Sequence, residues 1–95
     1  MEYEEFRNKV SLLHEIKSRT GRHYKNIRVI DDVVMLLRAD SDNPQENVKI
    51  NLHNLFDFCQ SNEITTKEAK KYGLSGKQSP SVALIDAIKS SRVPT

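Results

Sequence analysis

The sequence is poor in several residue types, and each scarcity excludes a class of protein. Cysteine occurs once, so no disulfide can form within the chain, which is typical of a reducing compartment. Glycine and proline occur three times each, which excludes collagen-like and low-complexity chains. The longest apolar run, residues 33–37, is far shorter than the ~20 residues that span a bilayer, and the acidic first residues differ from a signal peptide. We therefore expect a soluble, cytoplasmic protein without a membrane partner.

The length and composition fit one small domain. The 95 residues leave no room for two domains, so we predict a single domain over residues 1–95. Apolar residues make up 37% of the chain and charged residues 29%, which allows a small core and differs from the composition of disordered chains. The net charge of +2 is too small to indicate a nucleic-acid partner by itself.

Apolar spacing predicts an amphipathic helix over residues 1–20. One face of this helix carries Tyr3, Phe6 and Val10, which recur at the three- and four-residue spacing of a helix. Acidic residues fill the predicted first turn and basic residues the last, which suits the helix dipole. A glycine follows as a stop signal.

Residues 24–51 change to a β pattern. Valine and isoleucine are enriched there, and β-branched residues suit a pleated sheet. Asp31 and Asp32 predict a two-residue turn between the first two strands. Residues 47–51 alternate polar and apolar side chains and read as a third strand. Consecutive strands with short connections favour a three-stranded antiparallel meander.

The remaining part, residues 52–91, is predicted to form three short helices. Asn51 is a candidate N-cap for the first helix and Thr65 for the second. A serine caps the third, with Pro80 at its first helical position. Helices that follow the strands, rather than alternate with them, favour the α+β class. We therefore predict an α+β fold with an N-terminal helix, a three-stranded antiparallel β-meander and three short C-terminal helices.

The sequence shows no catalytic constellation. The three histidines are scattered, and neither HExxH nor CxxC occurs, so we predict no metal site. Cys59 lies on an apolar stripe without a nearby base, which favours a core residue over a nucleophile. We therefore predict that the protein is not an enzyme, and that it has no catalytic residue and no cofactor.

Residues 64–88 carry a pattern typical of a helix-turn-helix. Ala69 is small enough for a second helix to cross the first, Gly73 tolerates a positive φ in the turn, and Leu74 fills the corner. The second helix opens with a Gln-Ser pair and continues into an Ala-Leu core. This segment resembles the helix-turn-helix of phage repressor-type DNA-binding proteins. The alternative is a plain helical hairpin whose lysines form its solvated side.

The resemblance implies two sets of DNA-binding residues. The first turn of a recognition helix enters the major groove, where base edges would be contacted by Gln78, Ser79 and Ser81. Phosphates would be contacted by Lys67, Lys70, Lys71 and Lys77.

The charge distribution also favours an anionic partner. Residues 64–95 hold six basic and two acidic residues, a net charge of +4. Residues 17–28 form a second basic stretch without an acid. If folding joins the two segments, they form one positive surface that suits a polyanion. The alternative is a set of ordinary solvated faces.

Two functions from different classes follow. The first is a small non-enzymatic, regulatory protein that reads duplex DNA through the helix-turn-helix segment. A homodimer through an exposed Tyr3–Phe6 edge or through the outer sheet face would suit a symmetric DNA site. The alternative is a protein-interaction module that binds no nucleic acid, such as an accessory subunit or a small inhibitor derived from a phage or mobile element. A further alternative is that the chain is one domain of a longer protein.

Overall fold

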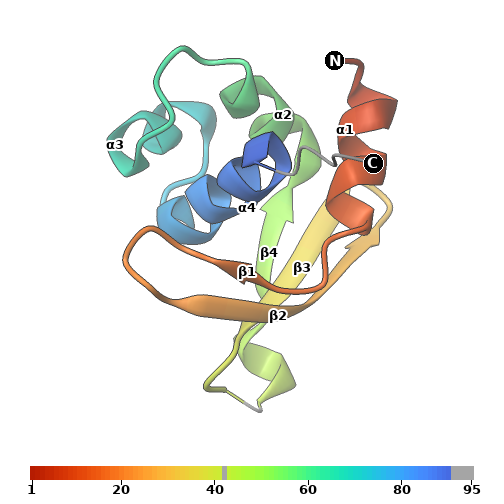
Figure 1. Ribbon diagram of the computed structural model, residues 1–95, viewed down its shortest axis with the longest axis vertical. Helices are drawn as coiled ribbons and strands as arrows, with labels where there is room; N and C mark the ends of the chain where they lie inside the picture. Colours follow the sequence, from red (N-terminus) through yellow and green to blue (C-terminus); the bar gives the residue numbers. More distant parts are fainter. Residues whose placement is uncertain (42, 91–95) are drawn as a thin grey trace.

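The computed structural model describes residues 1–41 and 43–90 and has an α+β fold. Four strands form one antiparallel sheet in the order β1-β2-β3-β4. Figure 1 shows the helices gathered on one face of this sheet. The predicted fold class and the meander are confirmed, with one strand more than expected. Among the described residues, no helix has the length and apolarity that crossing a membrane requires.

The N-terminal helix is shorter than its sequence pattern predicts. α1 spans Tyr3–Ser11, and the predicted second half of the helix is wrong. The chain turns after α1 and forms strand β1, Ile16–Lys17, in which Ile16 pairs with Tyr24. Burial alternates over residues 16–19, as it does in a strand. The sequence did not show this period, because the second buried residue is a serine.

The other three strands follow the predicted meander. They are β2 (His23–Ile30), β3 (Val33–Arg38) and β4 (Val48–Asn51), and the 3-10 helix η1 (Pro44–Glu46) precedes β4. The two-residue turn at Asp31 and Asp32 is confirmed, because the residues on either side of it pair across the hairpin. Asp31 has φ 54°, a conformation that aspartate tolerates better than most residues. Asn26, with φ 55°, lies where the register between β2 and β3 shifts.

The first two C-terminal helices begin at their predicted caps. α2 spans Leu52–Cys59, and the side chain of Asn51 accepts hydrogen bonds from the second and third backbone N–H groups of the helix. α3 (Thr66–Ala69) continues into the 3-10 helix η2 (Lys70–Tyr72). Thr65 caps α3 by accepting the N–H of the residue three positions on, at 3.1 Å.

The last helix, α4, spans Gln78–Ser90. Its predicted start, with a serine cap before Pro80, is wrong, because the helix begins earlier. The carbonyl of Lys77 accepts the Ser81 N–H at 3.1 Å and closes the first turn. Pro80 therefore occupies the third helical position, where an N–H would also lack a partner within the helix. The predicted end at residue 91 lies outside the described residues.

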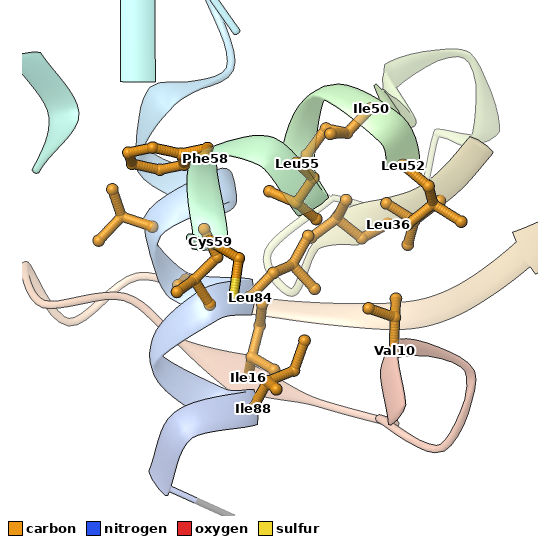
Figure 2. Close-up of a cluster of buried hydrophobic side chains, with 14 of the residues drawn as sticks. Val10, Ile16, Leu36, Ile50, Leu52, Leu55, Phe58, Cys59, Leu84 and Ile88 are labelled. Atoms are coloured by element: carbon orange, nitrogen blue, oxygen red, sulfur yellow. The ribbon is translucent and has the colours of Figure 1, made fainter. Parts of the chain in front are cut away.

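α4 is the centre of the hydrophobic core. Residues 80–85 are all buried, and so is Ile88. Figure 2 shows Leu84 and Ile88 in a cluster with Ile16 of β1 and Cys59 of α2. Burial raises the pKa of the Cys59 thiol. The predicted core role of this cysteine is confirmed.

A polar cluster joins α1, the β2–β3 turn and α2. The Tyr3 hydroxyl donates to Asp32 Oδ1 at 2.7 Å, and the Tyr3 ring stacks on His53 with 4.2 Å between centroids. The hydrogen bond from Tyr3 lowers the pKa of Asp32. Partial desolvation, together with the same bond, raises the pKa of Tyr3 to about 12. Phe6 beside this cluster is fully buried, so the exposed Tyr3–Phe6 edge expected for a dimer is wrong.

We expect the hydrogen bond between Tyr3 and Asp32 to stabilise the fold between about pH 4 and pH 10. The pKa of Asp32 is lower in the folded protein than in the unfolded chain. Asp32 therefore stabilises the fold at pH values above its unfolded pKa, and this stabilisation is lost as the pH falls through its folded pKa. Because the pKa of Tyr3 is raised, its contribution is lost as the pH rises through about 12. Asp32→Asn should reduce the free energy of unfolding at neutral pH and flatten its fall on acidification, as measured by denaturant titration. Tyr3→Phe should lose the same contribution, and equal stability of both variants and the wild type at neutral pH would contradict this role.

Candidate anion-binding site

The burial of α4 decides what the predicted base-contacting residues can do. In Figure 1, α4 lies between the β1–β2 hairpin and helices α2 and α3. Ser81 is 0% exposed, and its hydroxyl has no hydrogen-bond partner among the described residues. The prediction that Ser81 contacts base edges is therefore wrong. A recognition helix needs a free face that enters the major groove, and the buried residues 80–85 offer none.

Four of the seven predicted DNA-binding residues nevertheless gather around one hollow. Its volume is about 380 Å³, and it is lined by Thr66, Lys67, Lys70, Gln78 and Ser79. α3 and η2 contribute the two lysines, and the first turn of α4 contributes the glutamine and the serine. Neither ammonium group pairs with an acid among the described residues. We call this feature the lysine hollow.

A tight corner holds the two sides of the lysine hollow in place. Gly73 ends η2 with φ 76°, and a Cβ at this position would lie only 3.1 Å from Asn54 Nδ2. Leu74 is buried and donates its N–H to the carbonyl of Ala69, which is also buried, at 3.3 Å. This corner fits a helix-turn-helix and a helical hairpin equally. The burial of α4 favours the hairpin.

The other two predicted phosphate lysines do not line the hollow. Lys71 forms an ion pair with Glu68, with 3.2 Å between Nζ and Oε2. Lys77 is partly buried in the turn, where its N–H donates to the Leu74 carbonyl at 2.9 Å. The predicted set of four lysines therefore separates into two that flank the hollow and two that lie outside it.

The basic stretch of residues 17–28 reaches the C-terminal third at a second hollow of about 250 Å³. This hollow is lined by Ser18, Arg19, Thr20, Thr65, Thr66, Ser79 and Val82. It shares Thr66 and Ser79 with the lysine hollow, so the two adjoin. Arg19 donates to both carboxylate oxygens of Asp86, at 2.7 and 2.9 Å, and to the carbonyl of Ile64 at 2.8 Å. Asp86 raises the pKa of Arg19 and balances its charge, and this ion pair orients the β1–β2 loop against α4.

The chemistry of the two hollows suits an anion. None of the residues that line them is acidic. In the lysine hollow, two ammonium groups, two hydroxyls and one amide can donate hydrogen bonds to the oxygens of a phosphate. The beginning of α4 adds the positive end of a helix dipole. Among the residues that the structure describes, no group of three His, Cys, Asp or Glu side chains could hold a metal ion.

Sequence reasoning missed Thr66. It lies four residues before Lys70, and this spacing places both on one helical face, which was a usable signal. The basic charge of the β1–β2 loop was visible in the sequence, but its contact with the C-terminal third was not. Its contact with the C-terminal third joins Arg19 and Ile64, which are 45 residues apart in the sequence.

Comparison with known proteins gives no assignment, since no family model, no curated protein and no solved structure matches the chain.

We expect Ser81→Ala to raise the free energy of unfolding by about 1 kcal/mol. A buried hydroxyl without a partner costs about 1–3 kcal/mol, and alanine also favours the helix. Denaturant titration measures the change, and Ser79→Ala is the control, because Ser79 lines an open hollow and should give no such gain. If Ser81→Ala instead reduced DNA affinity at unchanged stability, the buried position of Ser81 would be contradicted.

Proposed function

We propose that this protein is a small, non-enzymatic DNA-binding protein that holds the phosphate backbone of duplex DNA at the lysine hollow. The observation that carries the proposal is the convergence of Lys67 and Lys70 with Gln78 and Ser79 around one hollow that no acid lines. Unpaired ammonium groups beside hydrogen-bond donors are the side chains that most often contact DNA phosphates.

The proposed contacts are with phosphates rather than with base edges. Phosphate contacts fix the position of a protein on DNA but carry no sequence information. Because Ser81 is buried and α4 is enclosed, α4 does not offer the free face with which a recognition helix contacts bases. Binding at the lysine hollow should therefore not depend on the DNA sequence. Gln78 and Ser79 would serve as hydrogen-bond donors to the backbone.

Two lysines make this interaction weak and dependent on salt. Each phosphate neutralised on duplex DNA contributes about −0.9 to the slope of log K against log salt concentration, so two contribute about −1.8. The affinity should accordingly fall about tenfold between about 50 mM and about 200 mM salt. Sequence-independent binding typically has a Kd of about 10⁻⁴–10⁻⁶ M at physiological salt, and two contacts favour the weak end.

We expect Lys67→Glu combined with Lys70→Glu to abolish DNA binding at low salt. The substitutions replace both unpaired cations of the lysine hollow by anions, which repel phosphate. Fluorescence anisotropy with two labelled duplexes of unrelated sequence measures the affinity at both salt concentrations. The wild type should bind the two duplexes equally.

The matched control is Arg28→Glu combined with Lys49→Glu, which changes the net charge by the same amount on the sheet instead of the helices. This control should retain most of the affinity. The proposal fails if the wild type does not bind either duplex at low salt. It also fails if both double variants lose binding equally, because net charge alone would then explain the affinity.

A further inference from the structure

The sheet has an outer face that α1, α2, α3 and α4 do not cover. It is covered only at one end, where Leu37 is buried outside the main core and η1 contacts β3. Met35 in β3 pairs with Arg28 in β2 and with Lys49 in β4, and directly opposed residues of antiparallel strands point to the same face. The neighbours of Met35 in β3, Val34 and Leu36, are fully buried in the core that the helices cover. Side chains alternate along a strand, so the row of three residues lies on the opposite face.

The centre of this face is apolar. Ile30 pairs with Val33 one row further along, and Ile30 is 51% exposed. Val33 and Met35 are partly exposed. These two rows also include Asn51, which pairs with Val33 and whose side chain caps α2. We call the other five residues, Arg28, Ile30, Val33, Met35 and Lys49, the outer sheet face. Large apolar side chains that gather on an exposed surface mark interaction sites more often than single exposed ones do.

Every charged residue in the four strands is basic. None of the strand residues is acidic, and the strands hold Lys17, Lys25, Arg28, Arg38 and Lys49. Arg28 and Lys49 lie on either side of Met35 and pair with no acid among the described residues. Among the described residues, the acids nearest the strands lie beyond their ends: Glu15 before β1, Asp31 and Asp32 in the β2–β3 turn, and Asp40 and Glu46 between β3 and β4.

An apolar centre between cations fits a protein better than a nucleic acid. Protein interfaces combine an apolar core with a polar rim, and electrostatic complementarity selects the partner. The outer sheet face holds no aromatic ring on which bases could stack. The major groove of DNA admits one helix or a two-stranded ribbon, whereas this face spans three strands.

We propose that the outer sheet face docks an acidic segment of a partner protein. An apolar side chain of the segment lies against Ile30 and Met35, and its flanking carboxylates lie against Arg28 and Lys49. Positive charge on both sides disfavours a second copy of this chain, because the same cations would face one another. This surface is separate from the lysine hollow and does not depend on DNA binding.

The test uses a phage-displayed library of random dodecapeptides. The library is selected on the full wild-type chain and counter-selected on Arg28→Glu combined with Lys49→Glu. We expect the recovered peptides to carry Asp or Glu on both sides of an apolar residue. Synthetic copies should bind the double variant about tenfold more weakly or worse, and replacing their carboxylates by amides should have a similar effect.

Two further variants separate this surface from the fold and from the lysine hollow. Ile30→Asp changes an exposed position, so the temperature of thermal unfolding should stay near that of the wild type. The affinity for the peptides should fall by a similar factor. Lys67→Glu combined with Lys70→Glu should leave peptide binding unchanged. NMR shifts of backbone amides should be largest in β2, β3 and β4.

The inference is overturned if no peptide binds the wild type more tightly than the Arg28 and Lys49 variant, or if neutral peptides bind equally well. It is also overturned if the NMR shifts caused by the peptides lie outside β2, β3 and β4. It is also overturned if duplex DNA, and not the peptides, gives its largest shifts on the outer sheet face. Because loss of DNA binding is tested at Lys67 and Lys70, this failure is distinguishable from failure of the proposed function.

Discussion

α4 is apolar on nearly all sides, and a helix of that kind is stable in water only when it is covered all round. The sheet covers one side, and α2, α3 and the β1–β2 hairpin cover the others. β1 contributes to this cover, since it places Ile16 beside α4. Burying one Ile, Leu or Val side chain contributes about 1.5–3 kcal/mol, whereas an exposed ion pair contributes about 0–1 kcal/mol. Burial therefore holds the hairpin on α4, and the ion pair between Arg19 and Asp86 orients its loop.

Because α4 is buried, its central residues cannot contact a partner. A helix at the centre of the core cannot also enter a DNA groove, because either role requires the same side chains. The two surfaces proposed for partners are the first turn of α4, where it meets α3 and η2, and the outer sheet face. The first belongs to the helical layer and the second to the sheet. If both proposals hold, DNA and a protein partner bind separate surfaces.

Local chemistry made the caps of α2 and α3 and two turns predictable, although it misplaced the start of α4. Contacts between residues distant in sequence could not be predicted. Asn51, Thr65 and Gly73 act within three residues of their own position, so the sequence contains the whole interaction. β1 has only two residues, and its pairing with Tyr24 comes from a separate segment. The burial of α4 did have a signal. Residues 82–85 are four consecutive apolar residues, which leave no polar face for a recognition helix. The sequence named four lysines alike, and only the fold shows that two of them, Lys67 and Lys70, line the hollow.

Pairing, rather than the count of charges, determines where an anion can bind. The net charge of +2 indicates almost no preference for a polyanion. Several acids are already engaged, since Asp32 accepts the Tyr3 hydroxyl, Asp86 holds Arg19 and Glu68 holds Lys71. The cations without an acidic partner among the described residues include Lys67 and Lys70 on the helices and Arg28 and Lys49 on the sheet. A nearly neutral chain thus holds two separate groups of cations without an acidic partner among the described residues, one on the helices and one on the sheet. The net charge, which is calculated from composition alone, does not show these two groups of cations.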